Sequence, residues 1–222
     1  LFTSLREWDF LAAQRPDIVV ANSYNVARRI KKFYRRKAKV IYPAVRTDNY
    51  FISRPKDYFL LVSRLEPHKK TEIAVEAFKE LPFKLKIVGT GSEYRKLKKM
   101  AQGARNIEFL GFVPDQELKK LYSSALALIF PQEEDFGLVP LESQASGRPV
   151  IAFAKGGALE TVKEGETGLF FKPQTPQALR KAVKEFRSQS FNPQKIRKWS
   201  ERFDVEVFKQ KWKELLDEVL KR

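Results

Sequence analysis

The feature that most constrains the fold is the alternation of short apolar runs with longer amphipathic stretches along almost the whole chain. The runs are too continuous in apolarity for a sheet with one wet face, so helices must cover both faces. The pattern predicts an α/β fold, a Rossmann-like doubly wound parallel sheet. The expected strands are Ile18–Ala21, Val40–Tyr42, Tyr58–Ser63, Leu85–Gly89, Ile107–Phe112, Ala125–Phe130, Val150–Phe153 and Gly168–Phe171. The expected helices are Thr71–Leu81, Glu93–Ala101, Asp115–Ser123, Leu138–Ala145, Gly157–Lys163 and Pro176–Arg187.

The same pattern divides the chain into three parts. Residues 1–43 hold too few strands for a domain of their own, so they are interpreted as the end of an N-terminal domain followed by a crossover. Residues 44–203 are the predicted Rossmann-like domain, and residues 204–222 a C-terminal helix. Within this end of the chain, residues 194–222 are interpreted as two helices broken around Phe203 and Asp204, and their apolar stripe, from Trp199 to Leu215, is expected to dock on its own domain. The chain does not begin with Met, which predicts an excised piece or a separate N-terminal domain.

The formal charge is +16, and residues 28–39 carry eight Lys or Arg and no acid. We interpret this segment as a basic helix. Such charge favours anionic partners, namely nucleic acid, acidic lipid or phosphorylated substrates, but a solvated helix face explains it equally well. No apolar run reaches the roughly 18 residues that a transmembrane helix needs. Zero cysteines exclude disulfides and thiol catalysis and agree with a cytoplasmic location.

Ligands of open parallel sheets bind at the carboxyl ends of the strands, and four such loops carry suggestive residues. After the strand at 58–63, Arg64 and Lys69 flank a proline turn and can clamp a diphosphate, or form an ordinary basic loop. After the strand at 85–89, Gly89 and Gly91 permit close approach of a ligand or simply a tight turn. The third glycine of a dinucleotide-binding motif is absent, so NAD binding is not favoured. The loop at Val113 offers an apolar ledge for a flat base.

The fourth loop follows the strand at 125–130 and carries three consecutive acids, Glu133, Glu134 and Asp135. Next come Phe136, Gly137 and Leu138, where the amides of Gly137 and Leu138 open a helix and form a diphosphate site. Glu142 lies one turn inside this helix, where a carboxylate can accept hydrogen bonds from ribose hydroxyls. Acids also collect at helix N-termini for dipole reasons alone, so residue types leave both interpretations open.

Four ordered segments resemble the retaining glycosyltransferases of family 4 (group 1). Glu134 and Glu142 are separated by seven residues, as in that family's Glu-x7-Glu motif. Residues 63–70, Ser-Arg-Leu-Glu-Pro-His-Lys-Lys, are similar to its Gly-Arg-Leu-x-Pro-x-Lys-Gly segment. Residues 87–91 resemble its Val-Gly-x-Gly turn, and residues 147–162 the strand and helix that follow the motif. Residues 5–23 and 41–43 look like a mannosyltransferase-like branch. Ser63 and Lys70 depart from the pattern, because the family has glycine there.

The resemblance implies the C-terminal, donor-binding half of a GT-B enzyme that transfers a sugar from a nucleotide-sugar, GDP-mannose as first choice, to a glycan or lipid-linked acceptor. Arg64 and Lys69 would hold the donor diphosphate with the amides at Gly137 and Leu138. The base would lie at Val113, the ribose at Glu142 and the sugar at Glu134, beside Gly89, Gly91, Asp135 and Phe136. The resemblance implies neither metal nor cofactor. It also suggests an enzyme inactive without its acceptor domain, peripheral to an anionic membrane through residues 28–39.

Two interpretations from other classes compete with this one. A nucleic-acid-binding module using residues 28–39 predicts base-stacking aromatics or a recognised fold, and neither is evident, so nucleic acid is not favoured. A regulatory relic would bind a nucleotide without turnover. Nucleotide binding combined with sugar transfer distinguishes the enzyme from both.

Overall fold

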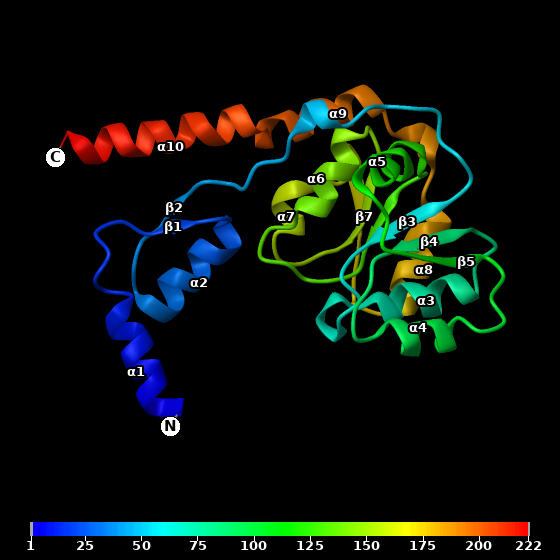
Figure 1. The fold of residues 1–222 in the computed structure, drawn as a ribbon, viewed down its shortest axis with the longest axis horizontal. Coiled ribbons are helices and arrows are strands. Elements are labelled where there is room, and N and C mark those ends of the chain that lie inside the picture. The colour runs from blue at the N-terminus through cyan, green and yellow to red at the C-terminus, as the bar shows by residue number, and fades with distance from the viewer. Residues whose placement is uncertain (1, 222) are drawn as a thin grey trace.

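The computed structural model describes residues 2–221 and contains a six-stranded parallel sheet in the order β5-β4-β3-β6-β7-β8 (Figure 1). Strands β1 and β2 pair with each other in a separate parallel sheet. The strands are β1 Val20–Ala21, β2 Lys39–Val40, β3 Phe59–Val62, β4 Leu85–Val88, β5 Ile107–Gly111, β6 Leu128–Phe130, β7 Val150–Phe153 and β8 Gly168–Phe171. The helices are α1 Phe2–Ala12, α2 Tyr24–Tyr34, α3 Thr71–Lys79, α4 Tyr94–Met100, α5 Asp115–Ser124, α6 Leu138–Ala145, α7 Ala158–Thr161, α8 Pro176–Glu185, α9 Pro193–Ser200 and α10 Val205–Leu220.

This architecture confirms the predicted Rossmann-like doubly wound fold. From β3 the sheet grows outward through β4 and β5, and then continues on the other side through β6, β7 and β8. The direction of winding therefore reverses between β3 and β6, which are neighbours. A crevice for ligands opens at the carboxyl ends of the strands at such a reversal. The loops after β3 and β6 meet there.

Two apolar cores flank the sheet, as its buried strands require. One core contains α3, α8 and the inward side chains of the strands, and the other contains α5 and part of α7. Helix α3 buries Ile73, Ala74, Ala77 and Phe78, as the predicted apolar face requires. Its end is fixed by Asn106, whose amide donates to the carbonyl oxygens of Phe78, Leu81 and Phe83 at 2.8–3.0 Å. Sheet, helices and connecting loops thus form one packed unit.

The expected basic helix over residues 28–39 is wrong in extent. Helix α2 ends at Tyr34, and Arg35 adopts a left-handed backbone with φ 55° and ψ 23°. Arg36 donates to the backbone carbonyls of Ala13, Gln14, Pro16 and Asp17. Lys39 belongs to β2 and pairs with Glu218. The left-handed residue stops the helix, so the eight cations do not share one helical face.

The C-terminal segment follows the prediction of two helices interrupted near Phe203 and Asp204. The Asp204 carboxylate accepts from the amide of Glu206 at 3.1 Å and so caps α10. Phe203 is buried, and the indole of Trp199 donates to the carbonyl of Thr161 at 2.8 Å. Beyond Asp204, α10 runs away from the sheet toward the N-terminal segment (Figure 1).

Candidate donor site at the sheet switch point

The loops that follow β3 and β6 contact each other through Lys69 and Glu134. The ammonium of Lys69 donates to the Glu134 carboxylate, and their side chains are 13% and 25% exposed. Arg64, in the same loop as Lys69, is exposed. Lys69 of the predicted diphosphate clamp and Glu134, predicted to contact the sugar, are therefore direct neighbours, and Lys69 is held by a counter-charge in the free protein.

Gly89 and Gly91 allow the loop after β4 to pack on the loop that carries Arg64. A Cβ atom at Gly89 would lie 1.8 Å from the carbonyl oxygen of Ser63, and one at Gly91 would lie 2.5 Å from that of Leu65. Gly89 also has a φ of 129°. The glycines thus serve contact between two protein loops at the edge of the site. The two glycines therefore permit the close approach of protein backbone, namely the carbonyl groups of Ser63 and Leu65.

Gly137 forms the start of α6, next to the acidic loop. It has φ 92° and ψ 100°, and no side chain caps the helix. Leu138 is 41% exposed. The amides at this helix start are consequently available to a ligand, with the positive end of the helix dipole behind them. On the other side of the loop, the Gly157 amide donates to the Glu134 carbonyl at 2.8 Å and fixes its backbone.

The side chains of two residues that were expected to contact the donor are instead buried in the protein. The Val113 side chain is buried, whereas its neighbour Phe112 is 81% exposed. The exposed apolar surface of this loop therefore belongs to Phe112, and the Val113 side chain is not part of it. The Phe136 ring is also buried and stacks on Tyr42, with centroids 5.3 Å apart. It anchors the loop rather than lining the crevice.

Glu142 is held by two tyrosines that the sequence analysis did not identify. Tyr122, fully buried, donates its hydroxyl to the Glu142 carboxylate at 2.6 Å. Burial raises the pKa of the Glu142 carboxyl, and hydrogen bonds from Tyr122 and Tyr50 oppose that rise. The two phenols fix the orientation of the carboxylate. An acid–aromatic contact across 20 residues leaves no local sequence signal.

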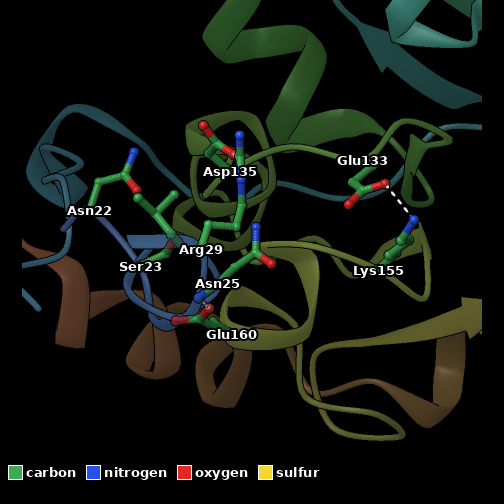
Figure 2. A network of polar contacts seen from close by, with 9 residues as sticks. Asn22, Ser23, Asn25, Arg29, Glu133, Asp135, Lys155 and Glu160 are labelled. Carbon is green, nitrogen blue, oxygen red and sulfur yellow. Dashed lines mark hydrogen bonds and ion pairs between the residues drawn. The ribbon is translucent and has the colours of Figure 1, made fainter. Parts of the chain in front are cut away.

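A second wall of the site comes from α2, as Figure 2 shows. Arg29 lies beside Asp135, with an N–O distance of 2.6 Å. The Glu160 carboxylate accepts from the backbone amides of Tyr24 and Asn25 at 2.8 and 2.7 Å, which satisfies the free amides at the start of α2. These contacts bring Arg29 into the wall of a cavity of about 610 Å³ that Glu134 and Asp135 also line. From sequence alone, Arg29 is only one cation of the basic segment at residues 28–39.

Among residues 2–221, no group of three or more His, Cys, Asp or Glu side chains is arranged to hold a metal ion. Within the same range, no helix combines the length and apolarity needed to cross a bilayer.

Comparison with known proteins identifies the family. Residues 47–203 match the model described as glycosyl transferases, group 1. The chain belongs to this family. It is 34% identical over 206 residues to a D-inositol 3-phosphate glycosyltransferase of Acidothermus cellulolyticus, with 77% of this chain and 45% of the relative covered. It is 26% identical to the human alpha-1,3/1,6-mannosyltransferase, with 77% and 50% covered. The chain thus spans about half the length of these relatives.

Solved structures confirm the GT-B assignment of this glycosyltransferase domain. Sucrose-phosphate synthase from Thermosynechococcus elongatus superposes with a TM-score of 0.88 at 23% identity, over 98% of this chain and 62% of that one. The Anabaena protein HepE, solved with UDP and glucose, gives 0.83 at 25% identity, over 97% and 67%. The fold is that of the C-terminal Rossmann-like domain of GT-B glycosyltransferases.

Proposed function

We propose that this chain is the donor-binding half of a retaining, family 4 glycosyltransferase. The observation that carries the proposal is the meeting of Lys69 and Glu134 at the sheet switch point, beside the uncapped start of α6. A nucleoside diphosphate placed there has a cation on one side and helix amides on the other. The relatives from Acidothermus cellulolyticus and human are a glycosyltransferase and a mannosyltransferase, which agrees with this chemistry.

In the proposed reaction, the bond from the anomeric carbon to the donor diphosphate breaks, a bond to the oxygen of an acceptor hydroxyl forms, and the proton of that hydroxyl passes to the leaving diphosphate. Negative charge grows on the leaving diphosphate, where Arg64, Lys69 and the amides at Gly137 and Leu138 stabilise it. The sugar becomes oxocarbenium-like, as in glycoside hydrolysis, next to the Glu134 carboxylate. Glu142, oriented by Tyr122, holds the ribose. The remaining half of the protein would supply the acceptor site, so this chain alone is expected to bind donor without transferring sugar.

The donor is proposed to be GDP-mannose, because the segment before residue 43 is mannosyltransferase-like and a human mannosyltransferase is among the relatives. We expect GDP to bind more tightly than UDP or ADP, and a chelator to leave the affinity unchanged, because two cations and a helix start neutralise the diphosphate. Calorimetry with each nucleotide, with and without chelator, measures this. If none of the three nucleotides binds, the proposed function loses its basis. If UDP binds more tightly than GDP, only the proposed donor changes.

The cations of residues 28–37 are proposed to hold the protein against an anionic membrane, where a lipid-linked acceptor lies. Those exposed and free of a nearby carboxylate within residues 2–221 include Lys31, Lys32, Arg35 and Lys37. Each is worth about 1 kcal/mol near an anionic leaflet. Replacing all four with glutamine should therefore weaken vesicle binding by about 4 kcal/mol, roughly a thousandfold. Sedimentation with anionic and neutral vesicles at low and high salt measures it.

The matched control removes four cations of α4, Arg95, Lys96, Lys98 and Lys99, which are exposed as well. It changes the net charge equally and should keep most vesicle binding. Equal losses in both variants would mean that only net charge matters. Tighter binding to RNA than to vesicles at the same salt would favour the nucleic-acid interpretation instead.

A further inference from the structure

Lys70 adopts a backbone conformation that favours glycine. Its φ is 55° and its ψ is 29°, in the left-handed region where a Cβ atom crowds the following carbonyl. Among residues 2–221, Arg35 is the one other non-glycine residue with a positive φ. The turn that imposes this geometry joins residues 67–69 to α3, with the Lys70 amide donating to the Pro67 carbonyl at 3.4 Å. A side chain at this position thus strains the backbone, which glycine would avoid.

The local contacts of the Lys70 side chain do not explain that strain. Its ammonium lies 3.6 Å from the Glu72 carboxylate, and the side chains are 42% and 28% exposed. Exposed ion pairs of this kind add little to the free energy of folding. What the side chain does is line the cavity of about 610 Å³ between the loop after β3 and α2. Residues with strained backbones cluster at active sites and ligand-binding sites, where the position of the side chain serves the function.

Arg29 lines the same cavity from α2, and Figure 2 shows it beside Asp135. Two of the three acids that line the cavity are matched by other cations: Glu134 contacts Lys69, and Glu133 lies 3.0 Å from Lys155. The third, Asp135, accepts from Nη1 of Arg29 at 2.6 Å. This pair is exposed, at 59% and 54%, and uses one of the guanidinium's nitrogens, so the other N–H donors of Arg29 can bind an anion while Asp135 stays paired.

Lys70 also precedes the start of α3, which no side chain caps, so the positive end of that helix dipole adds to the ammonium. Arg64 and Lys69, the proposed diphosphate clamp, are not among the residues that line the cavity. An anion bound in it would therefore be a second one, distinct from the donor diphosphate.

We propose that Lys70 is a ligand-binding residue and that its ammonium, with the guanidinium of Arg29 across the cavity, binds a phosphate group of the acceptor. This inference rests on the proposed function, because it places the acceptor beside Glu134. A phosphate dianion suits two cations that line one cavity, a point charge from Lys70 and a planar set of donors from Arg29. The phosphate belongs either to a sugar phosphate or to a glycerol phosphate headgroup.

The test measures binding of hexose 6-phosphate, glycerol 3-phosphate and inorganic phosphate to the 222-residue chain by calorimetry, with and without GDP, UDP and ADP. Lys70→Gly removes charge and strain together, and Lys70→Met removes the charge alone. Arg35→Gly is the matched control, since it relieves the same backbone strain outside the cavity. Thermal unfolding of each variant shows that it folds, and both glycine variants should melt no lower than the wild type.

Both Lys70 variants should bind the preferred phosphate at least tenfold more weakly than the wild type, with Arg35→Gly within twofold. Affinity for nucleoside diphosphate should stay within threefold in all of them. The preferred probe then identifies the source of the phosphate. Wild-type affinity in Lys70→Met, or no phosphate binding by the wild type, would overturn the inference. If the wild type binds phosphate in a Lys70-dependent way but binds no nucleotide, the proposed function is overturned. The phosphate site at Lys70 would still stand.

Discussion

Replacing Gly89 with alanine should destabilise the protein by about 4 kcal/mol, because the new Cβ atom would lie 1.8 Å from the carbonyl oxygen of Ser63. The backbone φ of 129° adds strain that a residue with a side chain rarely tolerates. Neither loop can retreat easily, since the Ser63 amide donates to the Val88 carbonyl at 3.1 Å and ties them together. Chemical denaturation of both proteins gives the difference in free energy of unfolding.

The control is Gly103→Ala, where φ is 86° but nothing lies within 4 Å of the new Cβ atom. It carries the cost of backbone strain without the clash, about 1–2 kcal/mol. The difference between the two variants isolates the loop contact. Equal destabilisation would show that the loops after β3 and β4 are free to separate.

Replacing Lys69 with methionine should weaken nucleoside diphosphate binding by about 1.5–3 kcal/mol, roughly ten- to hundredfold. The variant loses a cation beside the diphosphate. It also leaves the Glu134 carboxylate, 25% exposed, without its partner and facing the same anion. Calorimetry of the variant against the nucleotide that the wild type prefers measures the loss.

Lys155→Met is the matched control, because Lys155 also pairs with an acid of this loop, Glu133, at 3.0 Å. That pair is exposed at 61% and 44% and contributes little. The control should therefore bind nucleotide within about twofold of the wild type. Similar losses in both variants would point to the net charge of the loop rather than to a specific contact by Lys69.

The fold could be predicted because strand order in a doubly wound sheet follows from general rules. Buried runs such as 58–63 and 125–130 mark central strands, and right-handed crossovers place their carboxyl ends together. The side chains at those ends, Arg64, Lys69 and Glu134, could then be named without coordinates. The residue at which a helix ends is harder to predict when the amphipathic pattern continues beyond it. No residue in the basic run at 28–39 predicts the left-handed backbone conformation of Arg35, which ends α2.

Contacts between distant segments could not be predicted from one sequence. Glu160 binds the start of α2, more than 130 residues earlier, and Tyr122 binds Glu142 from another helix. Each depends on how packed elements orient a side chain rather than on a local pattern. For the same reason the predicted roles of Phe136 and Val113 were assigned to side chains that the core in fact buries.

The chain crosses between the N-terminal segment and the sheet twice, and the two crossings lie side by side. Val45 donates its amide to the Phe203 carbonyl at 2.9 Å, and Thr47 donates its amide to the Asp204 carboxylate at 3.1 Å. Because the two crossings are bonded to each other, neither segment can shift here without the other. With Glu160 on the start of α2 and Phe136 stacked on Tyr42, this point is one of the attachments that hold α2, and Arg29 with it, against the acidic loop.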